Sequence, residues 1–133
     1  MFKFSTGLAM AMSLAIVFAC GSNQTLRVTS IQLGRSVNAD RTLGGFTTTF
    51  APDDSVYLSV LTNGAGSATI GVRWMFNNRV IDEPKKHVTY AGPSATDFRL
   101  QNVGGFPLGD YTAEVFLNGQ SIGTRTFRVD TSR

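Results

Sequence analysis

Residues 68–76 read ATIGVRWMF, and every second side chain in this stretch is apolar. Successive side chains of a strand point to opposite faces, so this alternation predicts a half-buried β-strand. Residues 56–60, VYLSV, and residues 111–117, YTAEVFL, follow the same pattern. No segment of the chain after the N-terminal 25 residues has helical apolar spacing. These three strands therefore predict an all-β domain.

Six further segments are rich in β-branched or aromatic residues, which favour strands: residues 26–33, 46–50, 79–82, 87–90, 97–103 and 122–129. Asn77-Asn78 and Asn118-Gly119 supply the positive φ angles that two-residue hairpin turns need. The four prolines fall outside the three strong strands. The pattern predicts an antiparallel β-sandwich of about seven to nine strands. Residues 34–45 have little pattern, which leaves the strand order open.

The composition limits what the chain can do. With 133 residues, it is one domain, and its 42% hydrophobic content excludes a disordered chain. The net charge of +3 comes from scattered basic residues. So small a bias does not favour nucleic acid as a partner.

The N-terminus differs from the rest of the sequence. Lys3 is followed by an uncharged, mostly apolar run at residues 7–18. As a helix this run reaches about 18 Å, against roughly 30 Å for the hydrocarbon core of a bilayer. A basic start followed by a short apolar run indicates a signal peptide over residues 1–19. An uncleaved membrane anchor is the weaker reading.

The run Val17-Phe18-Ala19-Cys20 resembles the lipobox of bacterial lipoproteins, although leucine and a smaller residue are more usual at its first two positions. Cys20 is also the only cysteine. The resemblance implies a lipid (palmitate) on Cys20, a short tether over residues 20–25 and a β-sandwich domain over residues 26–133. It also implies a place in the cell envelope, on the outer membrane facing the periplasm. The alternative is ordinary cleavage after Ala19, which would release a soluble periplasmic protein.

A second resemblance rests on Val60, Trp74, Tyr111 and Ala113, with Gly109-Asp110 just ahead of the tyrosine. Their spacing resembles the core of an immunoglobulin-like or fibronectin-like β-sandwich. In that family two cysteines, a tryptophan and a corner tyrosine pack together. The resemblance implies that Val60 and Ala113 stand at the cysteine positions, so that all four residues are structural core without a disulfide. The alternative is plain core packing in another β-sandwich.

Residues suited to catalysis are scarce. His87 is the only histidine, and it follows two lysines in a segment that fits a solvent-facing edge better than a catalytic base. One histidine and one lipobox cysteine do not supply a zinc site. The carboxylates lack the spacing of a calcium loop. We therefore expect no catalytic residue, no metal, no cofactor and no enzymatic activity.

If the strands of Trp74 and Tyr111 lie in one sheet, as the immunoglobulin-like resemblance implies, their outward phase gives a candidate binding face: Arg73, Met75, Glu114 and Phe116. Arginine with aromatic residues is the composition enriched at the centres of interfaces. The alternatives are that residues 34–50 cover this face, or that its apolar side chains are simply exposed.

The sequence therefore predicts a non-enzymatic, membrane-tethered binding or assembly module of the bacterial cell envelope. Its partners would be the membrane, through the lipid on Cys20, and an envelope protein or polysaccharide. The alternative is an inhibitor or accessory subunit of an envelope hydrolase or protease, which would present residues 82–86 or 104–109 as a loop.

Overall fold

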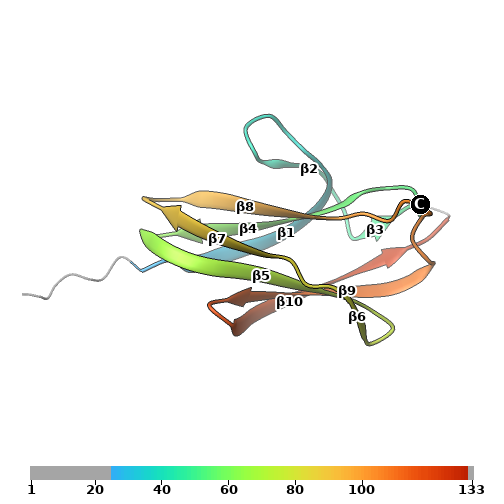
Figure 1. Ribbon diagram of the computed structural model, residues 1–133. Helices are drawn as coiled ribbons and strands as arrows, with labels where there is room; N and C mark the ends of the chain where they lie inside the picture. The colour runs from blue at the N-terminus through green and yellow to red at the C-terminus, as the bar shows by residue number, and fades with distance from the viewer. Residues whose placement is uncertain (1–24, 132–133) are drawn as a thin grey trace, which may run out of the picture.

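The structure, a computed structural model, describes residues 25–131. The predicted signal peptide, Cys20 and most of the predicted tether lie outside the described residues. Two β-sheets pack face to face, and the first and last described residues lie at opposite ends of the sandwich (Figure 1). The first sheet has the strand order β2-β1-β4-β8, and the second has the order β3-β10-β9-β5-β6, with β7 also paired to β5.

Ten strands make up the described part of the chain, slightly more than the seven to nine expected. They are β1 (Arg27–Val37), β2 (Leu43–Phe46), β3 (Thr49–Phe50), β4 (Val56–Asn63), β5 (Gly66–Phe76), β6 (Arg79–Asp82), β7 (Lys85–Tyr90), β8 (Ser94–Leu100), β9 (Gly109–Leu117) and β10 (Gln120–Val129). All pairs are antiparallel except β3 with β10, which is parallel. The all-β sandwich expected from the alternation is confirmed.

The core lies between the sheets. Val60, Trp74 and Ala113 are fully buried, and Tyr111 is 2% exposed. The Trp74 ring meets the Phe127 ring edge-on at 6.1 Å between centroids. The Tyr111 ring stacks on the same phenylalanine at 5.1 Å. Val60 on β4 and Ala113 on β9 come from opposite sheets, so apolar packing joins the sheets at the two positions where the resemblance expected cysteines.

A hydrogen bond fixes the start of β9. The Tyr111 hydroxyl donates to the carbonyl oxygen of Pro107, four residues upstream, at 2.7 Å. This is the geometry of a tyrosine corner. Phe106 packs edge-on against Tyr111, and its backbone N–H donates to the Pro52 carbonyl at 2.8 Å. The loop before β9 is therefore anchored at its base.

The turn residues behave as their chemistry predicts. Asn77 and Asn78 have φ angles of 51° and 62°, and Asn118 and Gly119 have 51° and 84°. Positive φ at both central residues is the requirement of a two-residue type I′ hairpin. These turns join β5 to β6 and β9 to β10. Both hairpin predictions are confirmed.

The patternless segment contains a hairpin. β1 continues to Val37, and β2 returns beside it. Residues 46–50, expected as one strand, divide into the end of β2 and β3, because the chain crosses here between the sheets. The Thr47 N–H donates to Leu33 of the first sheet, and the Thr48 carbonyl accepts from Arg128 of the second.

β8 also differs from its expected bounds of 97–103. It starts earlier, at Ser94, and ends at Leu100. The chain then turns, and the Gly105 N–H donates to the Asn102 carbonyl at 3.0 Å. A turn closed by this bond ends the strand before residue 103.

Candidate binding face

The predicted face lies on the outer side of the second sheet, where β5 and β9 are neighbours. Arg73 lies opposite Glu114, and Gly71 lies opposite Phe116. Because strand side chains alternate, Arg73, Glu114 and Phe116 all project away from the core. All three are half-buried.

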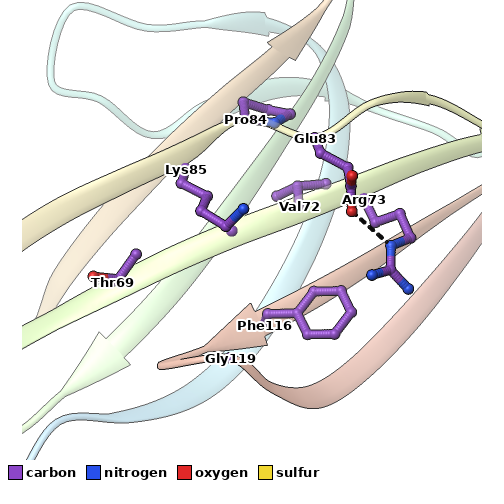
Figure 2. A pocket seen from close by; sticks show the side chains of 9 residues that line it. Thr69, Val72, Arg73, Glu83, Pro84, Lys85, Phe116 and Gly119 are labelled. Carbon is purple, nitrogen blue, oxygen red and sulfur yellow. Dashed lines mark hydrogen bonds and ion pairs between the residues drawn. The ribbon is translucent and has the colours of Figure 1, made fainter.

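Arg73 is at the centre of the face. Its Nε donates to Glu83 Oε2 at 2.8 Å, and its Nη1 lies 3.7 Å from Glu114 Oε1. Its guanidinium carbon lies 4.8 Å from the centroid of the Phe116 ring, within cation–π range. We name these four residues the Arg73 cluster. Figure 2 shows the guanidinium between the Glu83 carboxylate and the phenylalanine ring.

The ion pair affects the protonation of both partners. The hydrogen bond from Arg73 lowers the pKa of Glu83 below the usual glutamate value, and the bond to Glu83 raises the pKa of the arginine. Glu114 is fixed from its other side, because Ser121 Oγ donates to its Oε2 at 2.6 Å. The arginine is thus held in place between two carboxylates.

Pro84 explains how Glu83 reaches the face. β6 and β7 both pair with β5, and Pro84 lies in the junction between them. Proline has no N–H to donate, so the ladder is interrupted there. The Val72 N–H instead donates to the Pro84 carbonyl at 3.1 Å. This junction places Glu83 beside Arg73.

A shallow depression of about 160 Å³ adjoins the cluster. Its lining includes Thr69, Gly71, Lys85 and Phe116. A Cβ on Gly71 would lie 3.3 Å from Lys85 Cγ, so the glycine keeps the floor of the depression open. The depression therefore combines an aromatic ring, a hydroxyl and charges of both signs on one outward surface.

Met75 is the predicted face residue that lies outside the cluster. It is half-buried farther along β5, opposite Thr112 of β9 and Val80 of β6. Residues 34–50, the alternative cover for this face, contribute nothing to the lining of the depression, because β1 and β2 lie in the other sheet and β3 pairs with β10. Glu83 and Lys85, expected only within a loop over residues 82–86, were not predicted on this face. Counting from the Asn77-Asn78 turn places Asp82 opposite Arg73. The bulge between Trp74 and Met75 shifts the register by one residue, so that Asp82 lies opposite Trp74 and Glu83 reaches Arg73. The sequence carries no signal for this bulge.

His87 is exposed on β7, the edge position expected for it, and its Nδ1 lies 3.1 Å from Thr69 Oγ1. Within residues 25–131, no three histidine, cysteine, aspartate or glutamate side chains gather as a metal site. No helix in this part of the chain is long and apolar enough to cross a membrane.

No protein-family model matches the sequence, and no curated protein matches it either. Among solved structures, an immunoglobulin-like protein from Pseudomonas aeruginosa matches 83% of this chain and 100% of its own, with a TM-score of 0.57 and 13% identity. The domain has an immunoglobulin-like fold. At this identity the likeness shows the fold alone. A β-D-glucoside glucohydrolase from Trichoderma reesei gives a TM-score of 0.46 at 11% identity, over 81% of this chain and 19% of its own, which is too weak to bear on function.

Proposed function

We propose that the protein is a non-enzymatic, membrane-tethered binding or assembly module of the bacterial cell envelope, and that the Arg73 cluster is its contact surface. The observation that carries this proposal is the arginine held over Phe116 beside an open depression. Arginine and aromatic side chains dominate the energetic centres of protein interfaces, so we propose a protein partner.

The geometry of the cluster favours binding in a second way. Arg73 keeps 39% of its side-chain surface exposed although it is bonded to Glu83. Ordering a free arginine side chain on binding costs roughly 0.5–1.5 kcal/mol. Because Glu83, Glu114 and Phe116 already hold this side chain, less of that cost remains when a partner binds.

The proposed tether is a lipid on Cys20. One acyl chain holds a protein on a membrane only marginally, whereas two hold it stably. The five residue steps from Cys20 to Thr25 span at most roughly 17 Å. The domain would therefore stay close to the bilayer, where its effective concentration near partners in the same membrane is high. Gly21 after the cysteine is consistent with sorting to the outer membrane, facing the periplasm.

The test is cross-linking of the tagged protein in living cells, followed by purification from the membrane fraction. We expect one dominant partner that Phe116→Glu loses. Phe46→Glu is the matched control, because Phe46 is 63% exposed on β2 of the other sheet and should keep the partner. Recovery of no partner, or equal loss in both variants, would refute the contact surface. Cys20→Ser should leave the membrane fraction, and its retention there would refute the lipid tether.

A second function, an inhibitor or accessory subunit of an envelope hydrolase or protease, is favoured by one feature. Val103 is fully exposed on the loop between β8 and β9, whose base is fixed by the Tyr111–Pro107 hydrogen bond. An exposed apolar tip on an anchored loop is suited to insertion into a cleft. In that case Val103→Asp would abolish partner recovery and Phe116→Glu would not.

A further inference from the structure

The second sheet has an open edge at β10. β9 pairs with β10 along its whole length on one side. On the other side β3 pairs only with Arg128 and Val129. Within the described chain, residues 120–126 of β10 therefore pair with no strand on this side. Unpaired strand edges are the surfaces to which extended peptides add.

The hydrogen bonds to β3 show which backbone groups face this open side. The N–H groups of Arg128 and Asp130 donate to the Thr48 and Phe50 carbonyls at 2.8 and 2.9 Å. Backbone groups alternate along a strand, so the N–H groups of Thr124 and Thr126 point the same way. β3 thus covers only the part of this edge beside Arg128 and Val129, and the N–H groups farther along β10 stay unpaired with any strand of the described chain.

Arg125 covers part of the open edge. Its Nη1 donates to the Thr124 carbonyl at 2.9 Å, and its Nε donates to the Ile31 carbonyl of β1 at 3.1 Å. The guanidinium therefore bridges the edges of both sheets. A charged side chain in this position is one device that keeps an edge from pairing indiscriminately.

Charge indicates what the edge would accept. β1 and β10 contain four arginines, Arg27, Arg35, Arg125 and Arg128, and no aspartate or glutamate. Arg128 is paired with Asp110 at 2.7 Å, whereas the bonds of Arg125 go to neutral carbonyl oxygens. A carboxylate is a stronger acceptor for a guanidinium than a neutral carbonyl, particularly when both oxygens are engaged.

We propose that the open edge of β10 binds an extended acidic segment of a partner protein. The segment adds a strand beside residues 123–126, past the bulge that lies between Ser121 and Gly123. It bonds the N–H groups of Thr124 and Thr126 and places a carboxylate on Arg125. This site is separate from the Arg73 cluster and does not depend on the function proposed for it.

The test is selection from two displayed libraries of peptides of about eight residues, roughly a strand in length. One library has aspartate or glutamate fixed at alternate positions, and the other has asparagine or glutamine there. The bait is the whole protein as purified from cells. We expect enrichment from the acidic library alone, with the amide signals of Thr124 and Thr126 becoming protected from hydrogen exchange on binding.

Four variants locate the site. Thr126→Pro removes the N–H group of residue 126. The loss of its hydrogen bond to the added strand should weaken binding about fivefold. Arg125→Glu should weaken it about tenfold or more, whereas Arg79→Glu on β6 and Phe116→Glu on β9 should leave it unchanged. If Arg125→Glu fails to fold, Arg125→Gln replaces it. No enrichment, equal enrichment from both libraries, an affinity that Thr126→Pro leaves unchanged, or self-pairing of the protein through these amides would overturn the proposal.

Discussion

Replacing Tyr111 with phenylalanine tests the corner that fixes the start of β9. The substitution removes only the hydroxyl, which donates to the Pro107 carbonyl at 2.7 Å. The ring keeps its partners, because its centroid lies 4.5 Å from that of Phe76 and 5.1 Å from that of Phe127. A neutral hydrogen bond contributes about 1 kcal/mol net to the free energy of unfolding. We therefore expect a loss of about 1 kcal/mol, or roughly 4 °C in Tm for a domain of this size.

Urea denaturation followed by circular dichroism measures this loss, and Tyr57→Phe is the matched control. Tyr57 is half-buried, and its hydroxyl makes no hydrogen bond within the described residues; its ring lies under Arg99 at 5.5 Å. The control should change the free energy of unfolding by less than about 0.5 kcal/mol. Equal effects of the two substitutions would refute the special role of the corner.

The same substitution has a pH signature. Burial raises the pKa of Tyr111 above the ordinary tyrosine value. In the unfolded chain the hydroxyl ionises first, so stability is intact below about pH 10 and falls as the pH rises through the higher folded-state pKa. Tyr111→Phe removes this ionisation. The gap in stability between wild type and variant should therefore narrow above about pH 10, and a constant gap would contradict the burial argument.

Three further predictions concern the core, the face and a turn. Trp74→Ala should cost about 3–5 kcal/mol of unfolding free energy, since the ring is fully buried; a loss near zero in urea denaturation would place the core elsewhere. Arg73→Gln should return the pKa of Glu83 toward its ordinary value in an NMR titration, because the arginine hydrogen bond lowers it, and the stability from this pair is lost as the pH falls through that pKa. Asn118→Ala should cost about 1–3 kcal/mol in the same denaturation assay, because φ is 51° and its Oδ1 accepts from the Thr69 N–H at 2.9 Å; Asn118→Gly, which keeps the backbone freedom, should cost less.

Alternation predicted the three strong strands because each has one face in the core and a more polar face on the other side. In that situation the period of two is visible in the sequence itself. Trp74 and Ala113 lie opposite each other on β5 and β9 and are both fully buried. The outward residues Arg73 and Glu114 are neighbours for the same reason. The phase of each strand predicted which of its side chains face outward, and the immunoglobulin-like resemblance predicted that the two strands lie in one sheet.

Pairing between segments that are distant in the sequence could not be predicted from any such pattern. β3 is two residues long, and it joins β10 from about 80 positions away in the sequence, which no local pattern reports. Lys85 was not predicted on this face because the polar segment around Pro84 has no alternation of apolar and polar residues to indicate which way its side chains point. Its place in the depression depends on β7 pairing with β5, a tertiary contact. The Arg73 cluster could thus be predicted only for residues on the two strong strands.

The two arginines at the centre of the proposed surfaces differ in what surrounds them. Arg73 lies between Glu83 and Glu114, so its charge is compensated within the fold and the Phe116 ring is left as the main source of binding energy. Among the described residues, Arg125 bonds only neutral carbonyl oxygens, and its strand, β10, carries no carboxylate. An added carboxylate would gain most at the second position, since the first already has two. The face therefore favours an apolar contact and the edge a charged one, so that one small domain would distinguish two partners by their chemistry.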